Sequence, residues 1–75
     1  MTKDEMLERL QAAYPGSIIE VIDMTGTEDH WQVSIISSQF AGMKRIEQQR
    51  HVMQVFDKEL KTGEVHALTI QTRAQ

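Results

Sequence analysis

Two segments with the residue pattern of β-strands, 31–36 and 65–72, are separated by a stretch whose apolar residues recur at helical spacing. A helical connection between two strands of one sheet normally returns the chain parallel to the strand it left, with right-handed sense. Earlier in the chain, a β-branched run at 17–24 precedes a polar loop at 25–30, which predicts an antiparallel hairpin with the strand that follows. The sequence therefore predicts a mixed sheet of three strands.

The segment before this hairpin predicts a helix. Thr2 and Glu5 match the capping box that opens many helices, and Pro15 ends the apolar stripe that follows. The predicted element order is therefore α-β-β-α-α-β, which belongs to the α+β class. A chain of 75 residues has room for one thin core, so we expect a single domain over residues 1–75.

The long helical stretch carries an apolar stripe with one interruption. Nothing apolar lies between Ile46 and Val52, a gap of nearly two helical turns. We therefore expect two helices rather than one, with the bend near residues 48–50. Met53 falls on this stripe and Met6 on that of the first helix, and we interpret both as core residues rather than metal ligands.

The chain contains no cysteine, so it has no disulfide, no thiol nucleophile and no thiolate for zinc or an iron–sulfur cluster. Any cluster chemistry needs sulfur from a partner. The net charge of -3 and the pI of about 5.5 oppose non-specific attraction to nucleic acid. No apolar run approaches the length of a membrane span, and the acidic N-terminus lacks the layout of a secretory signal, so we expect a cytoplasmic protein.

Two histidines are predicted to lie close together in this topology. His30 comes just before the second strand, and His66 opens the third. Both strands of a parallel pair start at the same edge of a sheet, about 4.8 Å apart, so the two imidazoles could share one metal ion or one edge of a cluster. His51 belongs toward the far end of the domain, and we do not expect it to be a third ligand.

Spacing alone also fits two histidines with no shared role. His30 would then be a solvated loop residue. His66 has the parity of Leu68 and Ile70, so its ring would point partly toward the core with a satisfied hydrogen bond. A shared site and two unrelated histidines both remain open at this point.

Other candidate sites are weaker. Lys44, Arg45 and Arg50 form a basic cluster that could contact phosphate or be a solvated helix surface. The serine and threonine hydroxyls lack a carboxylate–histidine pair at a workable spacing, so we do not expect an enzyme. Gly26 and Gly42 stand alone, and the sequence has no phosphate-binding glycine loop.

Three segments resemble the BolA family, particularly its shorter members, and the resemblance covers essentially the whole chain. The segments are 23–33 (DMTGTEDHWQV), 40–49 (FAGMKRIEQQ) and 65–70 (VHALTI). The most specific signal is the F-x-G element that begins at Phe40, combined with the His-Ala-Leu element that begins at His66. A histidine followed by an aromatic residue, His30, adds to this signal in the loop of the hairpin.

This resemblance implies a fold related to the type II KH domain, with the helices on one face of a three-stranded mixed sheet. It also implies a partnership with monothiol glutaredoxins in iron–sulfur cluster trafficking or iron regulation. In such a heterodimer a 2Fe-2S cluster is held by cysteine from the glutaredoxin, cysteine from glutathione and histidine from the BolA-like subunit. His66 matches the invariant histidine of the family, and His30 matches its variable histidine-or-cysteine position.

The resemblance also suggests an alternative. A KH-like order, and the DNA-binding role proposed for some relatives, point to a nucleic-acid-binding transcriptional regulator that uses Lys44, Arg45 and Arg50. The chain lacks the G-x-x-G loop with which KH domains hold a nucleic-acid backbone. The R-H-R element of many relatives does not align with Arg50-His51, so His51 inherits no role. A homodimer of the free protein is compatible with the sequence.

Overall fold

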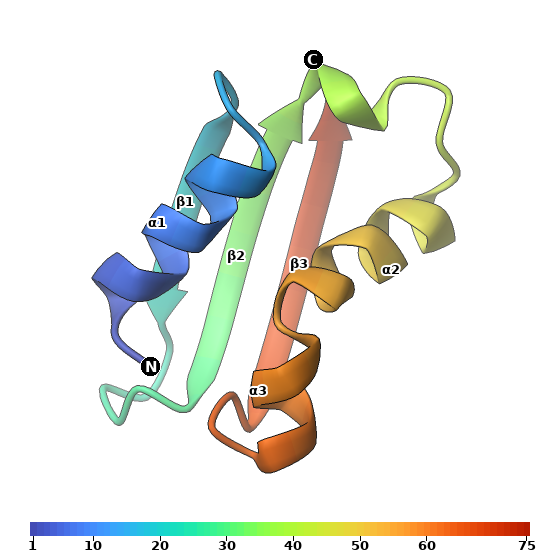
Figure 1. Ribbon diagram of the computed structural model, residues 1–75. Coiled ribbons are helices and arrows are strands. Elements are labelled where there is room, and N and C mark those ends of the chain that lie inside the picture. Colours follow the sequence, from blue (N-terminus) through green and yellow to red (C-terminus); the bar gives the residue numbers. More distant parts are fainter.

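The computed structural model describes all 75 residues (Figure 1). The helices are α1 (Lys3–Ala13), α2 (Arg45–Val55) and α3 (Asp57–Thr62), with a short 3-10 helix, η1 (Ser38–Phe40). The strands are β1 (Ile18–Asp23), β2 (His30–Ser37) and β3 (Ala67–Ala74). The expected order α-β-β-α-α-β is confirmed, with η1 added after the second strand. None of the helices has the length and hydropathy that a membrane crossing requires.

β2 is the central strand of the sheet. It pairs antiparallel with β1, where Ile18 lies opposite Ile36, and parallel with β3, where Trp31 lies opposite Leu68. The helices lie on one face of the sheet, with α1 in front of β1 and β2, and with α2 and α3 beside and in front of β3 (Figure 1). The mixed sheet predicted from the helical crossover is therefore confirmed.

The core lies between the sheet and the helices. Every second residue of β2 is buried from Trp31 onward, and the residues between them are only half-buried because no helix covers that face. Eleven apolar side chains form the core: Met6, Leu10, Tyr14, Val21, Trp31, Val33, Ile35, Phe40, Val52, Phe56 and Val65.

The helical stretch divides at Phe56 and not near residues 48–50. Phe56 separates α2 from α3, is fully buried and adopts φ -114° and ψ 22°. The number of helices was predicted correctly and the position of the bend wrongly. A gap in the apolar stripe was interpreted as a break, although α2 is continuous through it.

Polar contacts to β3 explain why α2 continues through this gap. Gln49 donates from Nε2 to the carbonyl of Ile70 at 2.9 Å, and Gln48 accepts from the hydroxyl of Thr72 at 2.6 Å. Amide side chains thus take the place that apolar residues usually hold on the inner face of a helix. Met53 lies on another face and is 47% exposed, so the expectation that it belongs to the core is wrong.

β3 is displaced toward the C-terminal end relative to the expected strand at 65–72. The N–H of Val65 donates to the carbonyl of Glu59 at 3.1 Å, so Val65 belongs to the connection from α3. At the other end, the N–H of Gln75 donates to the carbonyl of Ser37 at 3.2 Å, and pairing continues to the end of the strand.

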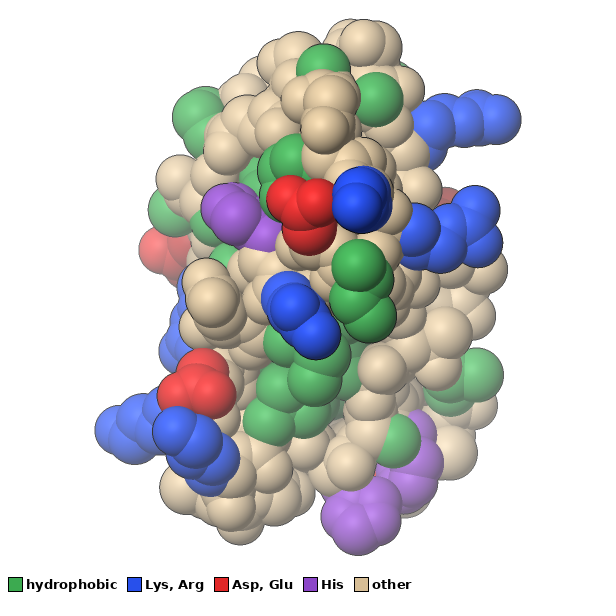
Figure 2. Space-filling view, turned by 90° about the vertical axis from the view of Figure 1, so that its right-hand side faces the viewer, with side chains coloured by type: hydrophobic (Ala, Val, Ile, Leu, Met, Phe, Trp, Pro, Cys, Tyr) green, Lys and Arg blue, Asp and Glu red, His purple; other side chains and the backbone are tan.

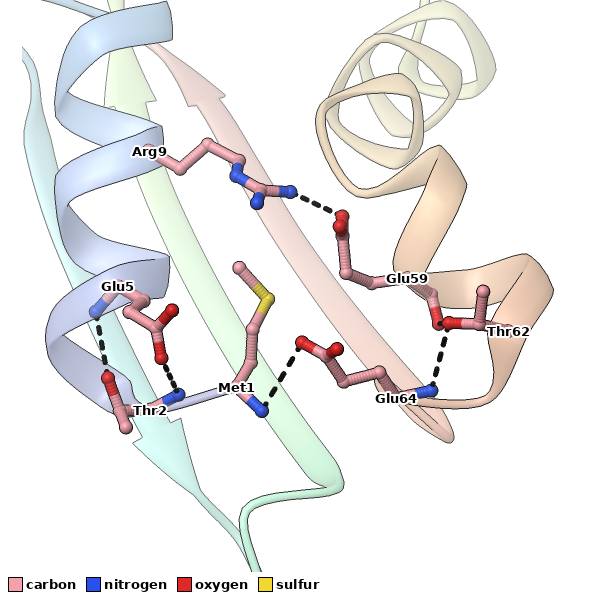
Figure 3. A network of polar contacts seen from close by, with 7 residues as sticks. All are labelled: Met1, Thr2, Glu5, Arg9, Glu59, Thr62 and Glu64. Carbon is pink, nitrogen blue, oxygen red and sulfur yellow. Dashed lines mark hydrogen bonds and ion pairs between the residues drawn. The ribbon is translucent and has the colours of Figure 1, made fainter.

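A partly buried ion pair links α1 to α3 (Figure 3). Arg9 donates to the carboxylate of Glu59, which is 8% exposed, and to the carbonyl of Val55 at 3.3 Å. The guanidinium of Arg9 also lies 5.6 Å from the ring centroid of Phe56. The hydrogen bond from Arg9 lowers the pKa of Glu59 below its ordinary value.

This lowered pKa predicts a pH-dependent contribution to stability. A carboxyl group whose pKa is lower in the folded protein stabilises the fold above its unfolded pKa, about 4.3, and loses that contribution as the pH falls further. We expect Glu59→Gln to lower the free energy of unfolding by about 1 to 2 kcal/mol at pH 7, because the variant loses the charged partner of Arg9. The loss is limited because the side chain of Arg9 is 40% exposed and partly solvated. Urea unfolding should show a smaller difference at pH 3, and an equal difference at both pH values would contradict this.

Candidate functional site

His30 and His66 lie side by side at one end of the sheet. Their ring centroids are 5.1 Å apart, and the ring planes are inclined by 52°. His30 is the first residue of β2, and His66 immediately precedes β3, which pairs parallel with β2. Histidine side chains gather at the lower end of the molecule in Figure 2, the end at which these two strands start. The proximity predicted from the crossover topology is confirmed.

Main-chain hydrogen bonds join the two histidine-bearing segments. The carbonyl of Asp29 accepts from the N–H of His66 at 2.8 Å and from the N–H of Ala67 at 3.1 Å. These bonds set the point at which the parallel strands begin. They use no atom of either imidazole.

Both rings can be reached from outside the molecule. His66 is exposed, and the side chain of His30 is 39% exposed. The expectation that His66 points partly toward the core is wrong. His66 precedes the first residue of β3, so the alternation that buries part of Leu68 and Ile70 does not extend to it.

Asp29 orients the ring of His30. Its Oδ1 lies 2.9 Å from Nδ1 of His30 and also accepts from the hydroxyls of Thr27 and Thr25. The hydrogen bonds from Thr27 and His30 lower the pKa of Asp29 to about 2, so it is a carboxylate at neutral pH. A carboxylate beside Nδ1 favours a proton on that nitrogen and leaves Nε2 free to bind a metal.

The loop that carries Asp29 is itself held in place. The carboxylate of Asp23 accepts from the N–H of Gly26 at 3.0 Å and from the N–H of Glu28 at 3.1 Å. Gly26 and Glu28 both have positive φ angles, 76° and 60°, which turn the chain tightly enough to reach β2. Sequence reasoning missed the role of Asp29, and its position directly before His30 was the available signal.

The two imidazoles could supply two ligands to a metal, but this chain places no third ligand beside them. No group of three or more His, Cys, Asp or Glu residues in the chain is arranged to hold a metal ion. Bonds between metals and imidazole nitrogens are roughly 2 Å long, so rings with centroids 5.1 Å apart can reach the same metal or cluster edge. The donor set fits a metal or cluster that a second molecule also ligates.

His51 lies away from this pair. Its Nδ1 is 2.5 Å from the hydroxyl of Tyr14, and its ring also faces Phe40 edge-on at 6.5 Å. Burial raises the pKa of Tyr14 to about 12, so the phenol keeps its proton and can donate to His51. The separation from His30 and His66 agrees with the expected placement of His51.

The basic cluster lies on the surface of α2. Lys44, Arg45 and Arg50 are all exposed, and none forms an ion pair within the chain. α2 and α3 meet at Phe56 with no glycine between them. The glycine loop of KH domains is therefore absent from the junction of the two helices.

A model of the BolA-like protein family matches residues 8–75. The chain belongs to this family. The resemblance seen in the sequence is thereby confirmed. The BolA-like chain is 30% identical over 79 residues to the DNA-binding transcriptional regulator BolA of Escherichia coli strain K12, and the match covers 96% of this chain and 74% of that protein.

Solved structures agree with this assignment. BolA1 from Arabidopsis thaliana matches the BolA-like chain with a TM-score of 0.84 and 29% identity, over 99% of this chain and 92% of that one. The BolA domain of SufE1 from Arabidopsis thaliana matches with a TM-score of 0.85 over 99% and 94% of the two chains. At 24% identity, this second similarity concerns the fold alone.

Proposed function

We propose that this BolA-like protein is an adaptor in iron–sulfur cluster trafficking or iron regulation. It binds a monothiol glutaredoxin, and the two proteins hold a 2Fe-2S cluster together with glutathione. The cluster is the cargo. His66 supplies one imidazole ligand, and His30 is the second candidate. The observation that carries the proposal is the exposed histidine pair, with centroids 5.1 Å apart, in a chain without cysteine.

The two histidines differ in a way that supports His66 as the principal ligand. No side chain holds the ring of His66, whereas Nδ1 of His30 is engaged by Asp29. An exposed ring without an internal partner can turn to meet a metal on another molecule. Histidine in place of thiolate raises the reduction potential of a cluster and makes its ligation sensitive to protonation.

Reconstitution tests the proposal directly. The protein is mixed anaerobically with a recombinant monothiol glutaredoxin, ferrous iron, sulfide and glutathione, and the products are separated by size. We expect a heterodimer whose visible absorption and circular dichroism spectra differ from those of the cluster-loaded glutaredoxin alone. Spectra equal to the sum of the separate proteins, with no heterodimer, would exclude the proposed partnership.

A second candidate is a nucleic-acid-binding transcriptional regulator. It is supported by the exposed Lys44, Arg45 and Arg50 on α2 and by the name of the Escherichia coli relative. Binding to a fluorescent DNA duplex should then weaken steeply with salt and be lost when all three residues are replaced by alanine. If the affinity for the duplex were unchanged by these substitutions, this candidate function would be excluded. The net charge of -3 opposes it.

A further inference from the structure

The outer edge of β3 presents backbone groups that no strand pairs with. β3 lies at one edge of the sheet. The N–H of Ala67 donates to Asp29, and the N–H of Gln75 donates to Ser37, so these bonds mark both ends of its ladder with β2. Residues two apart in a strand direct their N–H and C=O groups the same way. The odd-numbered residues of β3 therefore face β2, and the even-numbered residues face outward.

Leu68, Ile70, Thr72 and Ala74 are the outward-facing residues along this edge, and the first three lie along its middle. The carbonyl of Ile70 accepts from Nε2 of Gln49 at 2.9 Å. This partner is a half-buried side-chain amide on the inner face of α2, and a strand added at this edge would have to displace it and supply another donor. The edge thus offers backbone donors and acceptors with the two-residue spacing of an unpaired strand.

α2 forms a groove with this edge. The groove has a volume of about 290 Å³ and is lined by Arg45, Gln49, Ile70, Gln71 and Thr72. The first turns of α2 lie on the side of β3 that is away from β2 (Figure 1). A segment placed in the groove would have the strand edge on one side and the helix on the other.

Charge favours an acidic occupant. Arg45 is exposed and has no ion-pair partner within the chain. Residues 40–75 carry six basic and four acidic side chains, whereas residues 1–39 carry two basic and seven acidic ones. Lys and Arg side chains project from several places on the face that Figure 2 presents. The segment that supplies α2 and β3 thus carries more basic than acidic side chains, and the unpaired Arg45 at the groove favours a carboxylate.

We propose that the β3 edge and its groove bind an extended peptide segment of a partner protein by strand addition, with a carboxylate of the segment paired to Arg45. Backbone groups at two-residue spacing are matched by another extended backbone, and Arg pairs well with a carboxylate. The β1 edge of a second copy is also acidic and could pair with the β3 edge of the first. Such a contact is head to tail, so it would continue from copy to copy into an open-ended assembly. The binding needs no metal and is independent of the cluster proposal.

A displayed library of random linear peptides is the probe, selected on the intact protein without iron. We expect the enriched sequences to carry Asp, Glu or a free C-terminal carboxylate. Amide hydrogen exchange followed by NMR should slow by about tenfold or more at Leu68, Ile70 and Thr72 in the presence of a synthetic selected peptide. Exchange at Thr69 and Gln71, which already pair with β2, should change little. Binding that leaves the three outward amides unprotected would overturn the proposal.

Backbone methylation of the peptide distinguishes strand addition from side-chain binding and leaves the protein unaltered. Methylating one nitrogen at a time removes one donor, so affinity should fall at every second position. Arg45→Ala should weaken binding about tenfold, while Arg50→Ala, on the same helix outside the groove, is the matched control. A loss without alternation, or an equal effect of both variants, would contradict the proposal.

Two other occupants give different results. Self-association of the free protein, with concentration-dependent protection of the same amides, would assign the edge to a second copy and overturn the proposal. The other occupant is single-stranded DNA. If it displaced the peptide and bound Arg45→Ala as tightly as the unaltered protein, the proposed carboxylate contact would be overturned.

Discussion

Replacing His66 by alanine is expected to abolish the spectral change that this protein produces in a cluster-loaded monothiol glutaredoxin. The ring is exposed and unheld, so its loss removes a ligand and leaves the packing intact. The main-chain bonds from His66 and Ala67 to Asp29 remain, because they involve no side chain of His66. Visible circular dichroism of the heterodimer provides the measurement, and an unchanged spectrum would refute the ligand assignment.

Three further variants separate ligation from folding. His66→Cys should retain the cluster with a lower reduction potential, because thiolate replaces imidazole. His51→Gln should leave the spectrum unchanged, since His51 lies at Tyr14 and its replacement can still accept from the phenol. Asp29→Asn should shorten the lifetime of the cluster if His30 is the second ligand, because Nδ1 loses its carboxylate partner. No effect of Asp29→Asn would restrict ligation to His66.

Replacing Phe56 by alanine is expected to cause the largest loss of stability. The side chain is fully buried where α2 gives way to α3, and truncation of a buried phenylalanine costs about 3 to 5 kcal/mol. A domain of 75 residues has a total stability of roughly 4 to 11 kcal/mol, so the variant will be close to unfolded. Urea denaturation followed by far-UV circular dichroism measures the change.

Two other variants serve as controls for this loss. Phe56→Leu keeps most of the buried volume and should cost about 1 kcal/mol. Met53→Ala removes an apolar side chain of α2 that is 47% exposed, and should cost less than about 1 kcal/mol. If Phe56→Ala lowered the free energy of unfolding no more than Met53→Ala does, the stabilising role of Phe56 between α2 and α3 would be contradicted.

The element order and the proximity of His30 to His66 could be predicted because both depend on regular backbone geometry. Alternation in β2 marks a strand, and a helical crossover constrains the direction of the next one. Neither inference requires knowledge of any particular side-chain contact. The ladder from His30 to Ser37 confirms them together.

The features that were predicted wrongly or missed depend on individual contacts that a residue pattern does not reveal. Gln48 and Gln49 hold α2 against β3 through amide hydrogen bonds, which a hydrophobic pattern cannot register. The shift of β3 follows instead from a main-chain bond, in which the N–H of Val65 donates to the carbonyl of Glu59 in α3. The position of Asp29 beside Nδ1 of His30 depends on the conformation of the whole loop.

The parallel pairing of β2 and β3 has a thermodynamic consequence. The hairpin of β1 and β2 carries His30 alone, and the second ring lies beside it only when β3 pairs with β2. A metal bound by both rings therefore binds only molecules in which the last strand has docked, and by mass action it favours that docked form. Detachment of β3 would separate the two rings and release such a metal, so metal occupancy and completion of the sheet are linked equilibria.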